Sequence, residues 1–380
     1  MSTSLIPGAA DADGTGDYVR RKGAAVAAGH YSDFAATRLK ISSIGIGTFS
    51  GSASDEVDDA IAGIVALALQ GGINLIDTAA HYRYGRSASA VGRGLRKALS
   101  QGVSRNGVFL VSKGGFLLFP EGRPADFEEW FGREILGRGL GTREELAGLH
   151  LMTPAYLRHQ IEVSRQALGV ATIDAFLVDQ PEVQIPVAGK QQLIRRLDKA
   201  FVALEEAARD GLIQWYGISS FESFRVPQDH KAFLSLASLH ALAEQAAKQV
   251  LGEGARHHFA VIELPFNAVM PEGFTRFNQV LEQGNETSTL QAALRCGVFT
   301  IASHTLLKGH LARTSLDVLE QAMPRLSPAQ RALQFNRSTP GLGAALAGIS
   351  TPMHLEETLA VLRQPPLPTD AYLSMFQKAD

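Results

Sequence analysis

Short apolar runs alternate with longer amphipathic segments along most of the chain. Eight of these runs are rich in aliphatic and aromatic residues, and each has the length of a strand. They lie at residues 43–48, 73–78, 108–113, 174–179, 213–219, 259–265, 298–303 and 344–350. Because the runs are almost continuously apolar, they predict strands that are covered on both faces of a sheet.

The segments between the runs have the periodicity of amphipathic helices. We predict helices at residues 55–71, 87–99, 154–168, 193–209, 230–251 and 274–295, shorter ones from Leu316 and Pro328, and a last one from about Pro352. Two of the starts carry capping signals. Thr153 offers a side-chain acceptor before Pro154, whose missing N–H costs nothing in a first helical turn. Ser327 and Gln330 have the spacing of a capping box.

Eight strands, each followed by a helix, predict a parallel sheet that closes into a (β/α)8 TIM barrel rather than an open doubly wound sheet. An open dinucleotide-binding fold is the weaker alternative, because the stretch GIGTFSGSAS after the first run lacks the third glycine of the phosphate-binding turn. We expect one barrel domain over residues 25–380. Residues 1–24 lack apolar periodicity and predict a mobile N-terminal extension.

One long insertion, at residues 116–150, lies between the third and the fourth predicted strands. It leaves the carboxyl end of a barrel strand, where long loops usually serve function. We therefore expect this insertion to help wall a substrate pocket. Its aromatic residues could form that wall or pack in a core of their own: Phe116, Phe119, Trp130 and Phe131.

Composition narrows the function classes. The chain has 380 residues, of which 45% are hydrophobic and 19% charged, and this is ordinary globular composition. A formal net charge of −2 gives no general attraction to nucleic acid or to an anionic membrane. Cys296 is the only cysteine, which excludes an intrachain disulfide and favours a reducing, cytoplasmic location. The sequence predicts no signal peptide and no membrane span, and it does not indicate an oligomeric state.

Polar residues stand where the predicted strands end, and in a TIM barrel these ends face the active site. Each could be a helix cap when taken singly. A lysine at the end of an apolar strand is harder to dismiss, because Lys113 would need a carboxylate partner there, and Asp77 on the adjacent strand is the natural one. The other residues at strand ends are Asp179, Ser219, Ser220, Glu263, Ser303 and His304.

Tyr82 follows Asp77 by five residues, in the loop that leaves the same strand. A tyrosine beside a desolvated ammonium would have its phenolate form favoured. This is the property that a proton donor to a developing alkoxide needs. The alternative interpretation is that Tyr82 and Tyr84 are aromatic loop residues that pack over the barrel mouth.

Several of these segments together resemble the aldo-keto reductase family. NLIDTAAHYRYGRSASAVGRGL (residues 74–95) is similar to that family's signature, and FLVSKGG (residues 109–115) to its lysine strand. IDAFLVDQPE, GLIQWYGISSF and GISTPMHLEETL resemble its fourth strand, fifth strand and C-terminal cofactor segment. The order and spacing are kept from about residue 39 to residue 363.

The resemblance implies an NAD(P)-dependent oxidoreductase that interconverts a small carbonyl compound and an alcohol by hydride transfer. It makes Tyr82 the general acid, Lys113 the group that depresses its pKa, and Asp77 the partner of Lys113. It also implies a set of cofactor-binding residues, namely Gly47, Thr48, Ser219, Ser220, Glu263, Ser303, Leu306, Gly348, Ser350, His354 and Glu357.

Asp179 stands where the family has a histidine that donates to the substrate carbonyl. An ionised carboxylate can only accept a hydrogen bond, and it would raise the pKa of a nearby phenol. Either Asp179 is protonated and donates, or a substrate-binding imidazole replaces the missing one, for which we prefer His304 over His81. Two further alternatives remain: Asp179 acts as a base in a different reaction, or the barrel is a non-catalytic nicotinamide-binding regulator.

The cofactor segment also departs from the family pattern. Gly348 and His354 stand where NADP-preferring members have basic residues, and Thr358 stands in place of an asparagine. Because a 2′-phosphate prefers Arg or Lys, we expect NADP with a weakened preference, and NAD as the alternative. No metal site is indicated, since His257 and His258 are adjacent and cannot share one helical face.

Overall fold

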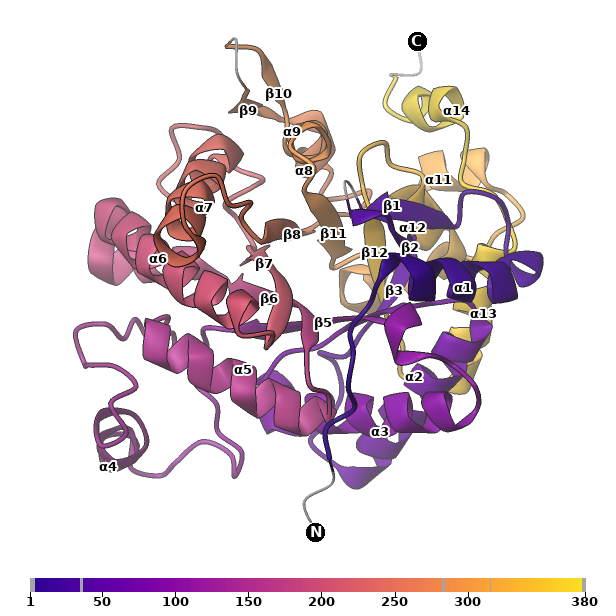
Figure 1. Cartoon of the computed structure of the whole chain (residues 1–380). Coiled ribbons are helices and arrows are strands. Elements are labelled where there is room, and N and C mark those ends of the chain that lie inside the picture. The colour runs from indigo at the N-terminus through magenta and orange to yellow at the C-terminus, as the bar shows by residue number, and fades with distance from the viewer. Residues whose placement is uncertain (1–3, 35–36, 282–283, 315, 378–380) are drawn as a thin grey trace.

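The computed structural model describes residues 4–34, 37–281, 284–314 and 316–377. Eight parallel strands form a closed barrel in the order β11-β12-β3-β4-β5-β6-β7-β8 (Figure 1). This confirms the predicted TIM barrel, and each of the eight apolar runs coincides with one barrel strand to within a few residues at either end. The strands are β3 (Ile44–Gly47), β4 (Leu75–Asp77), β5 (Phe109–Gly114), β6 (Ile173–Asp179), β7 (Ile213–Ser219), β8 (Phe259–Pro265), β11 (Phe299–Ser303) and β12 (Ala344–Gly348).

Helices surround the barrel, and most lie where the periodicity places them. The capping signals are confirmed, because Thr153 accepts a hydrogen bond from the Tyr156 N–H and Ser327 forms a complete capping box with Gln330. The longer helices are α2 (Asp55–Gly71), α3 (Arg86–Ser100), α5 (Pro154–Leu168), α6 (Ile185–Arg209), α7 (Leu236–Leu251), α9 (Thr289–Arg295), α12 (Pro328–Arg337) and α13 (Pro352–Leu362).

Shorter elements join these units. The short α-helices are α4 (Phe127–Phe131), α8 (Glu272–Thr275), α10 (His310–Arg313), α11 (Asp317–Ala322) and α14 (Thr369–Ser374). Single turns of 3-10 or π helix lie at η1 (Gly23–Ala25), η3 (Tyr82–Gly85), η4 (Arg105–Gly107), η5 (Gly132–Leu136), η6 (Pro181–Gln184) and η7 (Leu307–Gly309).

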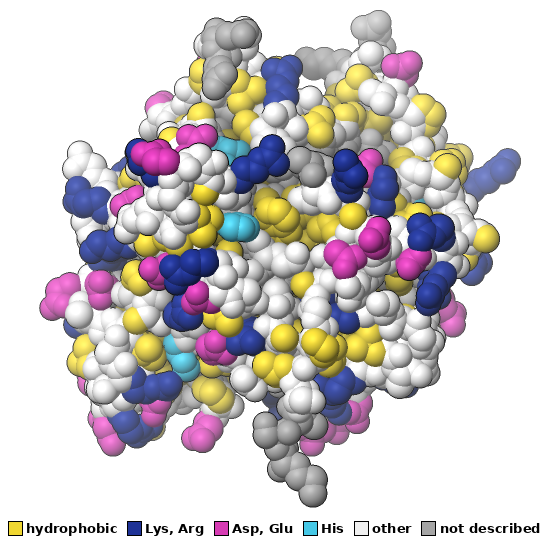
Figure 2. Space-filling model, in the orientation of Figure 1, with side chains coloured by type: hydrophobic (Ala, Val, Ile, Leu, Met, Phe, Trp, Pro, Cys, Tyr) yellow, Lys and Arg dark blue, Asp and Glu magenta, His cyan; other side chains and the backbone are white. Residues whose placement is uncertain are grey.

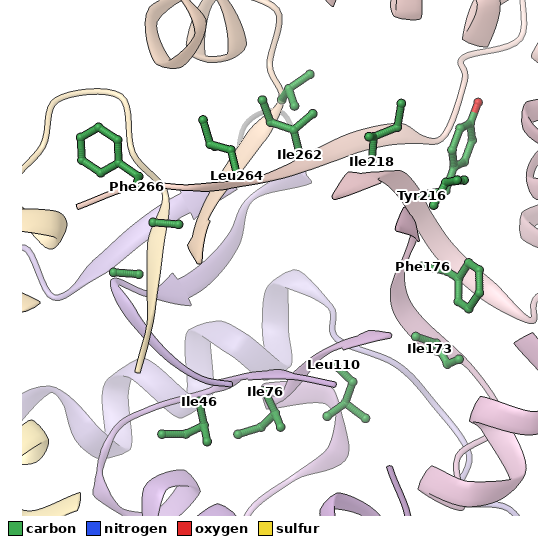
Figure 3. Close-up of a cluster of buried hydrophobic side chains, with 14 of the residues drawn as sticks. Ile46, Ile76, Leu110, Ile173, Phe176, Tyr216, Ile218, Ile262, Leu264 and Phe266 are labelled. Carbon is green, nitrogen blue, oxygen red and sulfur yellow. The ribbon is translucent and has the colours of Figure 1, made fainter. Parts of the chain in front are cut away.

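The hydrophobic core has two parts, as expected for a strand that is buried on both faces. One cluster fills the barrel interior and includes Phe109, Val111, Leu177 and Ile301. The other lies between the strands and the surrounding helices, and Figure 3 shows its side chains along the strands. It includes Ile46, Ile76, Leu110, Ile173, Phe176, Tyr216, Ile218, Ile262, Leu264 and Phe266.

The expectation of a mobile N-terminal extension is wrong for the part of residues 1–24 that the structure describes. Residues Ala12–Lys22 form helix α1, and its buried Tyr18 donates hydrogen bonds to the carbonyls of Leu69 and Ile73 at 2.5 and 3.0 Å. The Ala10 N–H donates to the buried carboxylate of Asp174 at 2.6 Å. Polar anchors rather than an apolar stripe hold this segment, so hydrophobic periodicity could not reveal it.

A two-stranded hairpin of β1 (Tyr31–Phe34) and β2 (Leu39–Ser42) follows this helix. Phe34 is fully buried and packs with its ring 5.7 Å from Phe109, 5.8 Å from Trp215 and 5.1 Å from Phe299, measured between ring centroids. The three partners stand on β5, β7 and β11, near the amino ends of these strands. The hairpin therefore closes the base of the barrel.

The helix predicted at residues 274–295 is also wrong. The structure has α8 there, then a projecting hairpin of β9 (Phe277–Val280) and β10 (Glu286–Ser288), and then α9 (Figure 1). The buried amides of Asn278 and Gln279 explain the change. They donate to the carbonyls of Phe224, Val226 and Leu234, which lie in the loop after β7.

The 116–150 insertion forms its own small core. Phe119 and Phe131 are buried in it, and Trp130 packs against Phe119 with 4.7 Å between ring centroids. These three aromatic residues therefore serve packing within the insertion. Phe116 alone of the predicted wall residues reaches the barrel mouth, where its ring lies 5.1 Å from that of His81.

Candidate active site

Lys113 lies at the centre of a buried polar cluster at the carboxyl end of the barrel. Its ammonium donates to Asp77 Oδ1 at 2.6 Å, to Tyr82 Oη at 3.2 Å, and pairs with Glu263 Oε2 at 3.2 Å. The lysine side chain is fully buried. Burial alone would lower the pKa of Lys113, but the carboxylates of Asp77 and Glu263 outweigh it and hold that pKa well above its usual value. The lysine is therefore cationic.

The position of each group follows from the strands. Asp77 ends β4, Lys113 stands on the neighbouring β5, and Glu263 reaches across from β8. The pairing of Asp77 with Lys113 is the one that the sequence predicts. The pairing with Glu263 was not anticipated, although a carboxylate on a fully apolar strand was a signal that it needs a cation.

Tyr82 is held on three sides. Its ring packs edge-on against Phe49 and against His81, with centroids 5.1 and 5.0 Å apart, and the Lys113 ammonium lies 5.1 Å from its centroid. Burial raises the pKa of Tyr82 above its usual value, and Lys113 opposes this rise without overcoming it. This differs from the expected depression of the pKa, because burial is the larger effect and Asp77, Asp179 and Glu263 further offset the charge of Lys113. The phenol is neutral and can donate a proton.

Asp179 stands at the end of β6, beside this cluster. Burial raises its pKa to about 7, with the charge of Glu263 adding to the shift and Lys113 opposing it. His81 Nε2 lies 3.5 Å from Asp179 Oδ2. Burial and the charge of Lys113 lower the pKa of His81 to about 3, so the ring is neutral at physiological pH. Asp179 thus changes its charge near neutral pH beside a neutral imidazole.

The preference for His304 over His81 as the replacement imidazole does not agree with this geometry. His304 lies against Phe221, with 5.4 Å between ring centroids, and its Nδ1 is 3.3 Å from Ser303 Oγ. His81 contacts both Asp179 and Tyr82. His81 is thus the better placed of the two imidazoles, and spacing along the sequence alone does not reveal which of them faces Asp179.

A second buried histidine fixes the backbone that carries Asp179. His150, from the end of the 116–150 insertion, is fully buried, and its Nε2 lies 2.7 Å from the carbonyl oxygen of Asp179. Its Nδ1 lies 2.8 Å from the side-chain nitrogen of Gln184. Sequence reasoning missed both residues. Burial lowers the pKa of His150 to about 4, so this ring is also neutral.

The predicted cofactor residues on β7 and β8 lie together. Ser219 donates to Glu263 Oε1 at 3.3 Å, which leaves the Glu263 carboxylate able to accept from a carboxamide NH2 group. Ser220 instead donates to Glu182 Oε1 at 2.8 Å, so its hydroxyl is used within the protein. The same Glu182 oxygen accepts the N–H of Phe221 at 2.7 Å. Glu182 was missed by sequence reasoning.

The other predicted cofactor residues lie on the neighbouring rim. Gly47 pairs with Gly348 across β3 and β12, and Thr48 donates from its hydroxyl to the Asp77 carbonyl at 2.9 Å. Ser350 lies 3.1 Å from His354 Nδ1 at the start of α13. The Glu357 carboxylate is bonded to Ser327 on α12, so it is already partnered.

Leu306 precedes the turn η7, in which Leu307 and Lys308 have left-handed backbones. This turn follows Ser303 at the end of β11.

Within the described residues, no group of three or more His, Cys, Asp or Glu side chains could hold a metal ion. No helix in the part of the chain that the structure describes is long and apolar enough to cross a membrane.

Comparison with known proteins decides the family. The model of the Aldo/keto reductase family matches residues 43–379. This chain belongs to the aldo/keto reductase family. It is accordingly an NAD(P)-dependent oxidoreductase that acts on small-molecule carbonyl groups. The family resemblance that its motifs carry is thereby confirmed.

Solved structures share the fold of this aldo/keto reductase. The glycerol dehydrogenase of Gluconobacter oxydans aligns over 92% of this chain and 95% of its own, with a TM-score of 0.62 and 19% identity. An aldo-keto reductase of Bacillus halodurans in its holo form covers 91% and 95%, with a TM-score of 0.59 and 18% identity. One from Klebsiella pneumoniae, in complex with NADPH, covers 90% and 92%, with a TM-score of 0.57 and 18% identity.

Proposed function

We propose that this aldo/keto reductase reduces a small aldehyde or ketone with Tyr82 as the proton donor. The observation that carries the proposal is the Tyr82 hydroxyl 3.2 Å from the buried Lys113 ammonium, inside a cluster that is anchored by Asp77. A neutral phenol beside a fixed cation can release a proton to a developing alkoxide, and the cation stabilises the phenolate that remains.

Several residues of the chain have separate roles at the carbonyl group of the substrate. A nicotinamide, when bound, supplies the hydride to the carbonyl carbon. Tyr82 Oη holds the carbonyl oxygen and gives it a proton, while Lys113 Nζ stays at 3.2 Å from the phenolate oxygen. Asp77 and Glu263 keep the ammonium in place, because each makes a direct contact with it. Phe49 and Phe116 shield this place from water with their rings.

Asp179 and His81 together take the place of a carbonyl-polarising imidazole. Because burial raises the pKa of Asp179 to about 7, its protonated form is accessible at neutral pH. The protonated carboxyl can donate to the carbonyl oxygen, which its ionised form cannot do. His81, as the neutral tautomer with its proton on Nε2, faces the Asp179 carboxyl with 3.5 Å between Nε2 and Oδ2. The Asp179 carboxyl then functions as the second donor.

The residues at the rim fit a nicotinamide nucleotide, and we propose NADP with NAD as the alternative. The Glu263 carboxylate, which accepts from Ser219, can also accept from the NH2 group of a carboxamide. The start of α13 carries the exposed Ser350 and His354 but no Arg or Lys between residues 348 and 358. A 2′-phosphate would therefore be held by hydroxyl, imidazole and backbone N–H groups, which predicts a modest preference for NADP.

Replacing Tyr82 with phenylalanine tests the proposal. The change removes one hydroxyl, and we expect kcat/KM for NADPH-dependent reduction of a panel of aldehydes and ketones to fall by roughly 10²- to 10⁴-fold. Nucleotide binding, followed by protein fluorescence, should change little. Tyr84→Phe is the matched control, because Tyr84 is 45% exposed and makes no contact with Lys113 among the described contacts.

Full turnover by Tyr82→Phe would show that another group donates the proton. If no member of the panel oxidises bound NADPH in the native protein, even in a single turnover, the reductase proposal is wrong and a non-catalytic nicotinamide-binding barrel is the better account. Titration with NADPH and NADH in parallel measures the cofactor preference.

A further inference from the structure

The residue after Tyr82 has an unusual backbone. Arg83 has φ of 52° and Tyr84 has φ of 60°, and both are followed by Gly85 with φ of 87°. Non-glycine residues seldom adopt this left-handed region, because Cβ crowds the carbonyl oxygen. Two such residues in succession stay in place only where the surrounding contacts fix them. The turn that presents Tyr82 is therefore held by something outside its own backbone.

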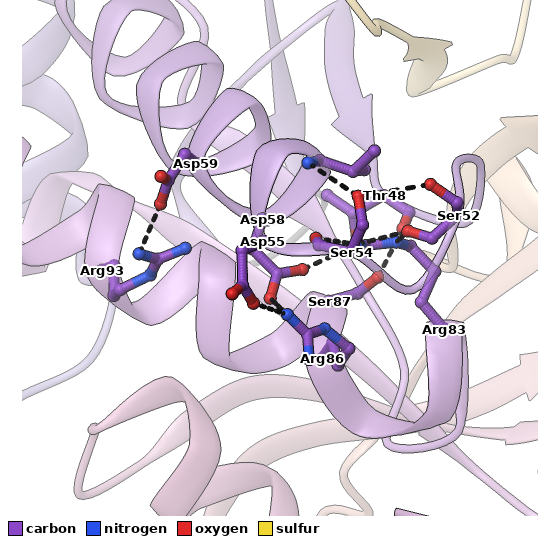
Figure 4. Close-up of polar contacts among 11 residues, drawn as sticks. Thr48, Ser52, Ser54, Asp55, Asp58, Asp59, Arg83, Arg86, Ser87 and Arg93 are labelled. Atoms are coloured by element: carbon purple, nitrogen blue, oxygen red, sulfur yellow. Dashed lines mark hydrogen bonds and ion pairs between the residues drawn. The ribbon is translucent and has the colours of Figure 1, made fainter. Parts of the chain in front are cut away.

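The side chain of Arg83 makes contacts that fix this turn (Figure 4). Its Nε and Nη2 donate to the Ser52 carbonyl at 2.9 and 2.6 Å, and Nη2 pairs with Asp58 Oδ1 at 2.6 Å. The side chain is only 2% exposed, whereas Asp58 is 14% exposed. A fork of charge-assisted donors in a buried place is among the strong hydrogen-bonding arrangements in proteins.

The partners of Arg83 belong to the segment after β3, residues 48–54, and to the first turns of α2. Asp58 on α2 also pairs with Arg86 at 2.6 Å, so one carboxylate joins two arginines of the Tyr82 loop. The same 48–54 segment carries Phe49, whose ring packs edge-on against Tyr82 at 5.1 Å. Phe49 is 64% exposed.

We propose that Arg83 is a positioning residue for the proton donor. It ties the loop that carries Tyr82 to the segment that carries Phe49, so that the phenol keeps its place between the Phe49 ring and the Lys113 ammonium. The inference rests on the proposed role of Tyr82. Arg83 does not touch the reacting atoms; its effect is on the geometry in which the proton is transferred, and a misplacement of about 1 Å there can cost roughly 10²-fold in rate.

A merely structural arginine would stabilise the fold without this effect, and the sequence offers a matched control. Arg93 on α3 pairs with Asp59 on α2 at 2.7 Å, so it is a second arginine that bonds to an aspartate of α2 (Figure 4). That pair is exposed, at 47% and 71% for its two side chains. Arg93→Ala therefore removes an arginine charge paired with α2 without changing the turn that carries Tyr82.

The test compares Arg83→Gly, Arg83→Lys and Arg93→Ala. Glycine suits the backbone at φ of 52°, so Arg83→Gly removes the fork while leaving the turn free of strain. Folded fraction and melting temperature are measured first, and the kinetics are then run well below each melting temperature. We expect kcat for carbonyl reduction to fall by roughly 10- to 100-fold in Arg83→Gly, with KM for NADPH within about twofold of the native value.

Arg83→Lys should recover part of the loss, because an ammonium can pair with Asp58 but cannot form the fork on the Ser52 carbonyl. Arg93→Ala should keep kcat within about twofold of the native value. Two results overturn the inference: a kcat in Arg83→Gly within twofold of the native protein, or equal losses in Arg83→Gly and Arg93→Ala. If Tyr82→Phe is also fully active, then the proposed function itself has failed; if only Arg83→Gly is active, the positioning role alone has failed.

Discussion

Replacing Asp179 with asparagine removes a site carboxyl whose pKa burial raises to about 7. The pKa of Tyr82 lies well above the physiological range, and that of His81, lowered by burial, is about 3. Burial and the charge of Glu263 raise the pKa of Asp179 from 3.8 to about 7. We therefore expect Asp179 to contribute a protonation step near pH 7 to the rate of carbonyl reduction, and the asparagine variant tests that assignment.

The structure also predicts the effect on stability. The folded pKa of Asp179 is raised above its unfolded value. The contribution of Asp179 to the stability of the folded protein is therefore fully present below pH 3.8 and is lost as the pH rises through about 7. The difference between the two pKa values corresponds to about 4 kcal/mol of unfolding free energy. The carboxamide introduced by Asp179→Asn cannot ionise, so the variant should lose that part of the pH dependence while keeping a donor N–H beside the carbonyl.

The assay has two parts. The first is the pH profile of kcat/KM for NADPH-dependent reduction, which should decline above about pH 7 in the native protein and become flat there in Asp179→Asn. The second is denaturant unfolding at about pH 5 and about pH 8, where the native protein should be less stable at the higher pH and the variant much less sensitive. If Asp179→Asn keeps both the inflection and the stability difference, another group titrates there and the assignment is refuted.

Three further outcomes follow from the fold and the site. Deleting residues 1–24 should lower the melting temperature markedly, because Tyr18 and the Ala10 N–H bond to the barrel; a mobile extension would leave it unchanged in a thermal melt. Phe34→Ala should cost about 3–5 kcal/mol of unfolding free energy in urea titration, and a cost below about 1 kcal/mol would mean that the base closes without this ring. His81→Gln should reduce kcat more than His304→Gln, since His81 contacts Asp179; the reverse order in steady-state kinetics would restore His304 as the substrate-binding imidazole.

The barrel could be predicted because a strand buried on both faces leaves a continuous apolar run, as at residues 174–179 and 259–265. The pairing of Lys113 with Asp77 could be predicted for a related reason, since a lysine that ends such a run cannot stay unpaired. Both predictions rest on burial that can be recognised from the sequence alone.

The structural features that could not be predicted depend on contacts that leave no local pattern in the sequence. Helix α1 is held by hydrogen bonds from Tyr18, and the hairpin that replaces the predicted helix at residues 274–295 is held by the amides of Asn278 and Gln279. The position of His81 beside Asp179 depends on how the loop after β4 folds, which a single sequence does not mark. Each of these features is set by tertiary partners far along the chain.

The hairpin at the base of the barrel bears on the order in which the chain can fold. Phe34 is synthesised early, but its ring partners Phe109, Trp215 and Phe299 leave the ribosome successively later. Contacts between residues so distant in sequence form slowly, since the intervening chain must first be ordered. The hairpin therefore lacks one of its packing partners until residue 299 has emerged. Packing of Phe34 against the barrel strands belongs among the last steps of barrel assembly.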